Sequence, residues 1–243
     1  MIRQQNMRAP PWMDGSQFTP VFFGHFHADL LRRVTPAPPE IAEELAARGL
    51  VSVESSPAST RLLGAALSWI IRLQDLASLI YASVTDIHFL ESETGYDVSH
   101  SEPRWRSTIF VSVPDRSDDI GALRLAESVV HEAMHLHLTN REQETWFVKE
   151  SDGTMCSPWR AERRPFQGVL HGLYVFSCLS FFFKRLIVDE ALVASSRVYL
   201  TQRLTEIEGE VQSIDFVTLA SGLTERGVAL MEECAGVVIH PYC

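Results

Sequence analysis

The sequence contains few cysteines, and they follow no pattern that would build a site. Four occur among 243 residues, at positions 156, 178, 234 and 243, and no CxxC pair is present. This scarcity excludes a disulfide-rich secreted scaffold and a cysteine-based zinc motif. It is typical of free thiols in a reducing compartment, so we expect a cytoplasmic protein.

Basic residues are also scarce relative to acidic ones. The chain has 21 Lys and Arg against 31 Asp and Glu, which gives a formal net charge of −10. Without a basic surplus, the protein lacks the charges that displace counterions from a nucleic-acid backbone. We therefore expect no nucleic-acid partner, whereas a cationic peptide is compatible with this charge.

Long hydrophobic runs are nearly absent. Residues 1–15 contain no apolar stretch of the kind that a secretory signal peptide requires. The one strongly apolar segment, residues 169–183, contains His171 and is followed by Lys184 and Arg185. It is short for a bilayer span and suits a buried core helix, so we expect a protein that does not enter the membrane.

Apolar periodicity predicts an α+β fold that is mostly helical, in a single domain with a small β-sheet. Helices are expected over 40–48, 58–82, 117–139, 166–187, 189–209 and 215–236. Strands are expected at 84–90 and 108–113, a third near 145–148, and a loop over 150–165.

Two regions follow from this pattern. The proline-rich residues 1–38 predict an irregular N-terminal arm with a short helix near 26–33, in which His25 and His27 suit a strand edge or a loop. Residues 39–243 predict a helical metal-binding domain whose sheet lies beside the 117–139 helix.

The most informative motif is the pentapeptide 131–135, HEAMH, an instance of HExxH in a predicted helix. Residues four apart lie one above the other on a helix, so His131 and His135 offer two nitrogen ligands to one divalent metal. Glu132 is close enough to reach a water or ligand on that metal. The flanking apolar residues favour this interpretation over a chance surface pair, because both histidines border the stripe formed by Ile120, Leu123, Ala126, Val129, Val130, Ala133 and Met134.

Two imidazoles do not complete a catalytic centre, which normally has three protein ligands and open positions. The longer HExxHxxGxxH motif is absent, because Leu138 and Arg141 occupy the positions of its glycine and third histidine. Glu190 could complete a thermolysin-like set, although a solvated, helix-capping carboxylate is the favoured interpretation of that residue.

His171 is the preferred third ligand. A histidine in so apolar a segment is either a hydrogen-bonded core residue or a ligand. Gly168 and Gly172 on either side of it would let a backbone or a bulky ligand approach closely. Three histidines would form a facial set for ferrous iron with three open positions.

Arginines gather between the HExxH motif and His171. Arg160 lies in the sequence SPWR, and Arg163 and Arg164 precede Pro165. Arginine binds carboxylates through two parallel hydrogen bonds, which suits an acidic substrate or cosubstrate. A solvated basic loop that balances an acidic protein is the equal alternative.

The combination of HEAMH, SPWR, RRP and GVLHGLYVF resembles the HExxH-motif peptide-modification proteins of ribosomally made peptide pathways. The resemblance covers about residues 117–190. Members of that family act as iron(II)- and α-ketoglutarate-dependent β-hydroxylases of precursor-peptide side chains. The resemblance therefore implies Fe(II), α-ketoglutarate and dioxygen as cofactors and a precursor peptide as partner.

The resemblance also implies a role for each matching residue. His131, His135 and His171 would bind the iron. Arg160 or Arg164 would hold the distal carboxylate of α-ketoglutarate, and the sequence does not separate the two. Glu132 would orient a water or the peptide.

Two other functions stay open. A zinc metallopeptidase would use Glu132 as general base on a metal-bound water, with Glu190 or His171 as third ligand. A non-catalytic peptide-binding partner would carry a structural or degenerate HExxH motif.

Overall fold

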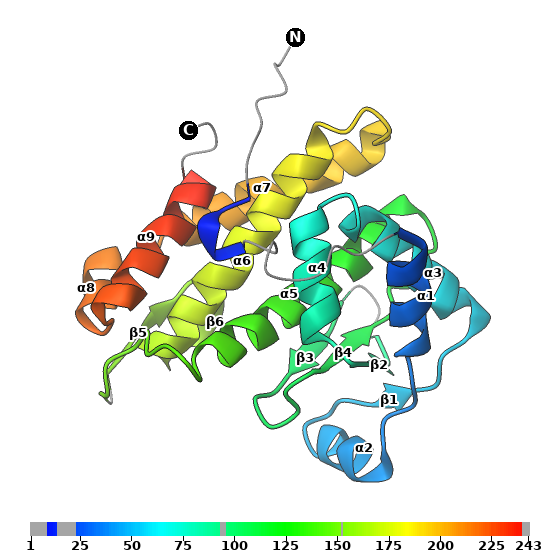
Figure 1. Cartoon of the computed structure of the whole chain (residues 1–243), viewed down its shortest axis with the longest axis horizontal. Coiled ribbons are helices and arrows are strands. Elements are labelled where there is room, and N and C mark those ends of the chain that lie inside the picture. Colours follow the sequence, from blue (N-terminus) through cyan, green and yellow to red (C-terminus); the bar gives the residue numbers. More distant parts are fainter. Residues whose placement is uncertain (1–8, 14–22, 93–95, 152, 240–243) are drawn as a thin grey trace. The chain divides into compact units, whose positions relative to one another are not determined.

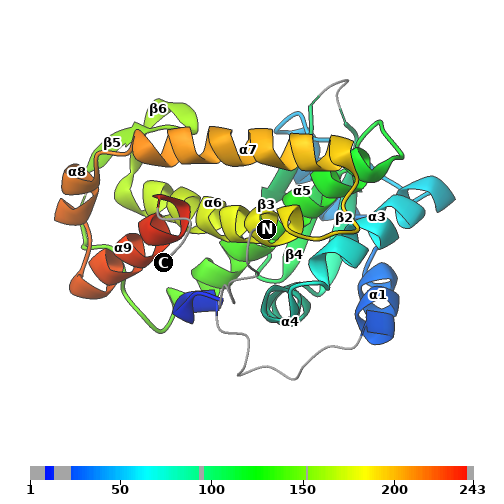
Figure 2. The ribbon, with the colours of Figure 1, turned by 90° about the horizontal axis from the view of Figure 1, so that it is seen from above.

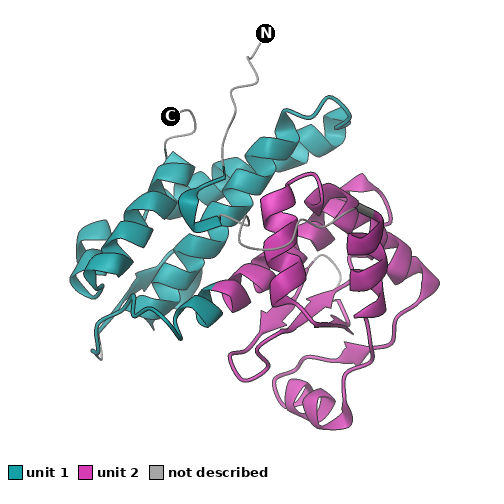
Figure 3. Ribbon diagram, in the orientation of Figure 1, with its two compact units in different colours: residues 1–14, 138–243 teal, residues 15–137 magenta. Residues whose placement is uncertain are grey.

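The computed structural model of the protein describes residues 9–13, 23–92, 96–151 and 153–239 (Figure 1). The expected class is confirmed, because most described elements are helices and one small mixed sheet accompanies them. The chain forms two compact units, unit 1 (residues 1–14 and 138–243) and unit 2 (residues 15–137), shown in Figure 3. The division of the sequence into an arm over 1–38 and a domain over 39–243 stays a prediction.

Unit 2 combines helices with a four-stranded sheet. Its helices are α1 (Phe23–Arg32), α2 (Pro39–Ala46), α3 (Pro57–Ile70), α4 (Gln74–Ser83) and most of α5 (Asp119–Arg141), and its strands are β1 (Ser52–Val53), β2 (Asp86–Leu90), β3 (Ser99–Ser101) and β4 (Thr108–Ser112). The order is β1-β2-β4-β3, with β2 and β4 parallel and both edge strands antiparallel. The expected strands are thus confirmed as β2 and β4.

The central strands β2 and β4 are buried on both faces, and side chains along β4 point alternately to the two faces. Phe110 packs with Leu90 of β2 and Leu45 of α2 in a core cluster on one face. Its neighbours Ile109 and Val111 point to the opposite face, where they pair in register with Ser101 and Ser99 of β3. The β3 serines therefore lie on the face away from α2.

Two expectations for unit 2 are wrong. The single helix expected over 58–82 is broken after Ile70, and Leu73, in an extended conformation, precedes α4. The two helices bury separate apolar faces, and together these give one long apolar segment in the sequence. His25 and His27 lie in α1, because burial of Phe26 and Leu30 one turn apart favours a helix over a strand or loop.

Unit 1 is built around α6 (Phe166–Ile187), where the sequence predicts a helix with the same bounds. It also contains the 3₁₀ helix η1 (Pro11–Met13), strands β5 (Thr154–Ser157) and β6 (Arg160–Pro165), and helices α7 (Ala194–Gln212), α8 (Phe216–Ser221) and α9 (Glu225–Ile239). Helices α7 and α9 both pack against α6, and Figure 2 shows α7 running beside it.

Three expectations for unit 1 are corrected. Within the segment expected as a loop, residues 154–165 form a β-hairpin, because cross-strand pairing between β5 and β6 stabilises a polar sequence that has no apolar period. The helix expected over 215–236 is divided into α8 and α9 around residues 222–224. Residues 145–148 form an isolated bridge between Val148 and Leu223, because the segment turns after a single pair.

Helix α6 is the one described helix that is long and apolar enough to cross a bilayer. Two thirds of its most apolar window, 67%, is buried inside the structure. This burial fits the core helix of a soluble protein, as the sequence predicts for residues 169–183.

Candidate metal centre

Helix α5 carries the HExxH motif in its second half. It begins after Asp118, whose carboxylate accepts a hydrogen bond from the backbone N–H of Gly121 at 3.0 Å. This side-chain cap satisfies one of the backbone N–H groups that have no partner within the first turn. Its expected apolar stripe is buried apart from the half-buried Ile120. The helix is therefore fixed at its start and along one side.

The two imidazoles of the motif come together on α5. The ring centroids of His131 and His135 are 4.9 Å apart, with an angle of 65° between the planes. Both side chains are half-buried, as expected for residues that border the apolar stripe. Two imidazoles one helical turn apart suit a divalent metal with nitrogen ligands, so this donor pair fits ferrous iron or zinc.

Glu132 is buried beside this pair, with 4% of its surface exposed. Its Oε1 lies 4.0 Å from Nε2 of His131. Ser99 donates a hydrogen bond to Oε1 and Ser101 donates one to Oε2, each at 2.6 Å. Sequence reasoning missed both serines, because Ser-His-Ser carries no apolar pattern and lies more than 30 residues from Glu132.

His100, between the two serines, points to the other face of β3. Its ring lies 6.1 Å from that of Phe110, and its Nε2 lies 3.3 Å from a carboxylate oxygen of Glu102. Burial lowers the pKa of His100, and the negative charge of Glu132 opposes this shift. The histidine therefore belongs to the packing beneath α2 and not to the imidazole pair.

The expected third ligand, His171, lies on α6 in unit 1. Its Nε2 is 3.0 Å from Oε2 of Glu142, and Gln167 donates a hydrogen bond to the same oxygen at 2.9 Å. The side chain is largely covered, with 13% of its surface exposed.

The glycines beside His171 make room for side chains of the hairpin. A Cβ on Gly172 would overlap the indole of Trp159, and a Cβ on Gly168 would lie 3.1 Å from Nε of Arg164. Trp159 also stacks on Phe176, with centroids 5.0 Å apart and 11° between planes. The space predicted for a backbone or a ligand is therefore occupied by SPWR and RRP, so these motifs and the LHG glycine form one packed assembly.

The three arginines of the hairpin have different surroundings. Arg160 is exposed at the start of β6, whereas Arg164 is half-buried against the first turn of α6. Arg163 donates hydrogen bonds to the backbone oxygen and the hydroxyl of Thr154 and to the sulfur of Cys156. Its guanidinium thus stabilises the hairpin.

The other candidate ligand, Glu190, is exposed in the turn between α6 and α7. Among the described residues, no group of three His, Cys, Asp or Glu side chains is placed to hold a metal ion. His131 and His135 come together in unit 2 and His171 belongs to unit 1, so its role as third ligand stays a prediction.

Comparison with known proteins adds no relative to this picture. No protein-family model matches the chain, and no curated protein matches it.

Proposed function

We propose that the protein is an iron(II)- and α-ketoglutarate-dependent dioxygenase that hydroxylates a side-chain β-carbon of a ribosomally made precursor peptide. The observation that carries the proposal is the imidazole pair of α5 with the buried carboxylate of Glu132 beside it. The motifs SPWR, RRP and LHG also support the proposal, because together with HEAMH they resemble those of a family with this activity. The surplus of acidic residues suits a cationic peptide, and the scarcity of cysteine suits the cytoplasm.

His131, His135 and His171 are the iron ligands in this proposal. Iron(II) held by them supplies, with α-ketoglutarate and dioxygen, the oxidative hydroxylation of an unactivated C–H bond and releases succinate and carbon dioxide. Glu132 holds its carboxylate next to His131, where it can accept a hydrogen bond from a water or from the peptide.

Arg164 is the better of the two arginines for the distal carboxylate of α-ketoglutarate. Its guanidinium lies over Gly168, one helical turn before His171, whereas Arg160 is exposed at the hairpin turn. The N-terminus of α6, with its free backbone N–H groups and positive dipole end, adds to the attraction for an anion. Arg164 and this helix end therefore attract the same carboxylate.

The first experiment is anaerobic addition of Fe(II) and α-ketoglutarate to metal-free protein. A visible charge-transfer band is expected, and the substitutions His131→Ala, His135→Ala and His171→Ala should each abolish it. His25→Ala is the matched control, because His25 is an exposed histidine on α1. Zinc binding without a band would refute the dioxygenase proposal.

The arginine assignment has its own test. Arg164→Ala should weaken α-ketoglutarate binding by about 10- to 100-fold, as expected for loss of a charged hydrogen-bond pair of about 1.5–3 kcal/mol. Arg160→Ala should change it less than threefold. Titration of the charge-transfer band measures both, and the reverse order would assign the cosubstrate to Arg160.

A zinc peptidase is the second candidate, favoured by the 4.0 Å separation between Glu132 Oε1 and His131 Nε2. In that enzyme Glu132 would be the general base on a metal-bound water. Glu132→Gln distinguishes the two functions. A peptidase should lose activity by several orders of magnitude, whereas the dioxygenase should keep iron binding and succinate production.

A further inference from the structure

The segment before β4 presents alternate side chains to α5. Asp97 accepts two hydrogen bonds from Arg124, at 2.6 and 2.9 Å, and Ser99 and Ser101 hold Glu132. Residues 97 to 101 span about 13 Å of extended chain, and the eight residue-to-residue steps from Arg124 to Glu132 span about 12 Å of helix. The strand and the helix are therefore matched in length, and all three polar side chains reach their partners.

Two hydroxyl groups on two different oxygens fix the carboxylate of Glu132 more strictly than one would. A single hydrogen bond leaves the group free to turn about its last side-chain bond, whereas two define the plane of the carboxylate. Each bond is 2.6 Å long, within the range of O–H···O hydrogen bonds. Because Glu132 is buried, these donors replace the water that would otherwise solvate its charge.

The position of this carboxylate decides what it can do. Its Oε1 is close to Nε2 of His131, and a glutamate free to turn could bind a metal held by the two imidazoles. We propose that Ser99 and Ser101 are positioning residues, a serine clamp that holds Glu132 beside the imidazole pair and prevents it from becoming a metal ligand. The clamp follows from the two hydrogen bonds to Glu132, and the exclusion from the metal rests on the proposed function.

The clamp itself is tested on the metal-free, full-length protein. The pair Ser99→Ala and Ser101→Ala should lower the urea midpoint of unfolding. In a Glu132→Ala background, the shift that the same pair causes should be at least threefold smaller. Ser128→Ala is the control, because its buried hydroxyl bonds to the backbone of Arg124 on the same helix. Its effect should be equal in both backgrounds. Equal effects of the serine pair in both backgrounds would overturn the clamp.

The exclusion of Glu132 from the metal is tested with cobalt(II), whose visible absorption reports its ligands. The alanine pair should change the spectrum of bound cobalt, and with Glu132→Ala added it should leave the spectrum of the Glu132→Ala protein unchanged. Threonines at positions 99 and 101, which keep the hydroxyls and suit a strand, should restore the wild-type spectrum.

The outcomes separate the clamp from the proposed function. A spectrum of the alanine pair that superimposes on that of the wild type, or a change that persists without Glu132, would overturn the exclusion. Failure of the chain to bind cobalt at all would overturn the exclusion together with the proposed function, while the urea cycle would still decide whether the clamp exists.

Discussion

Replacement of Gly172 by alanine should destabilise the protein, although alanine is the better helix former. A Cβ at this position would overlap the indole of Trp159, a rigid ring that stacks on Phe176 and donates a hydrogen bond from Nε1 to Glu210 at 3.1 Å. The overlap forces either the helix or the indole to move. The hairpin would then lose contacts that tie it to α6 and α7.

The magnitude follows from these contacts. Overpacking costs about 1–3 kcal/mol. If Trp159 is expelled, loss of its stacking on Phe176 adds about 0.5–1.5 kcal/mol. Loss of its hydrogen bond to Glu210 then adds about 1.5–3 kcal/mol. Alanine regains only about 0.5–1 kcal/mol of helix propensity. Since the chain relaxes partly, we expect a net loss of about 2 kcal/mol, or a melting temperature lower by roughly 4–8 °C.

Thermal unfolding followed by circular dichroism measures this change. Gly209→Ala is the matched control, because Gly209 lies in α7 with nothing within 4 Å of an added Cβ. It should raise the midpoint by roughly 1–4 °C. The variant with both Trp159→Ala and Gly172→Ala should be no less stable than Trp159→Ala, because the overlap is gone. The reasoning fails if Gly172→Ala melts with, or above, Gly209→Ala.

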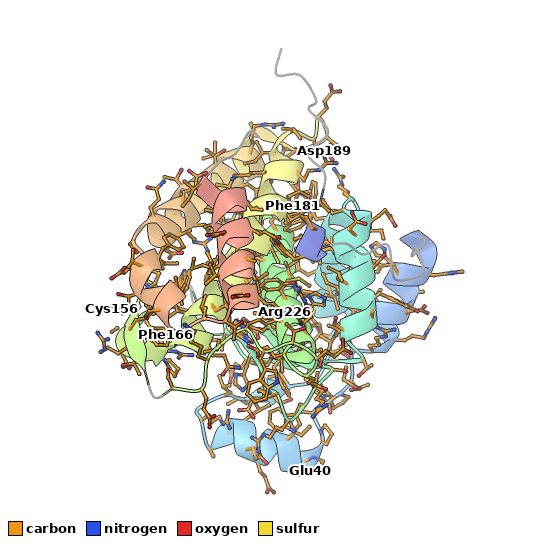
Figure 4. The ribbon with its side chains drawn as sticks, turned by 60° about the vertical axis from the view of Figure 1, so that its left-hand side comes forward. Glu40, Cys156, Phe166, Phe181, Asp189 and Arg226 are labelled. Carbon is orange, nitrogen blue, oxygen red and sulfur yellow. The ribbon has the colours of Figure 1, made fainter. Side chains whose placement is uncertain are left out.

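Two further predictions concern cysteine reactivity and pH. Burial raises the pKa of Cys178 and Cys234, whereas Cys156 is exposed at the periphery (Figure 4). A Cys243→Ser protein should therefore show one thiol that reacts fast with Ellman's reagent when folded, and three in denaturant. Fast reaction of more than one thiol in the folded protein would contradict this. Burial lowers the pKa of His100, so the unfolded state binds more protons below about pH 6.5 and stability should fall as pH drops from 7 to 5. Urea midpoints across that range should fall less steeply for His100→Gln, and an equal slope would show that His100 is not the cause.

The long apolar helices could be predicted from the sequence because their periodicity is strong. Helix α6 begins and ends at the residues that its apolar run predicts, and the HExxH motif lies in α5 as expected. The interruptions near Leu73 and Leu223 were hidden, because both residues are buried by tertiary contacts and continue the apolar pattern. Gly222 was the one local signal of the second interruption, and its lack of a side chain leaves room for Phe166.

The candidate site was predictable where its chemistry is local. His131 and His135 are one helical turn apart, so their proximity follows from sequence spacing. The serines that hold Glu132 depend on a three-residue edge strand, which forms by pairing with β4 and not by its own propensity. The role of the glycines beside His171 was also not predictable, because Trp159 and Arg164 reach them from a hairpin whose strands carry no apolar period.

The hydrogen bonds that join Asp97, Ser99 and Ser101 to α5 have a consequence for the transfer of this candidate metal site to another protein. A graft of the HEAMH turn alone onto a new scaffold would transfer two imidazoles and a glutamate. Nothing in that turn would fix the orientation of the glutamate's carboxylate. The smallest portable module is the hairpin from residue 97 to 112 together with the helix from 119 to 135. The ion pair of Asp97 and Arg124 sets the position of the helix along the strand, so that the carboxylate of Glu132 meets the hydroxyls of Ser99 and Ser101.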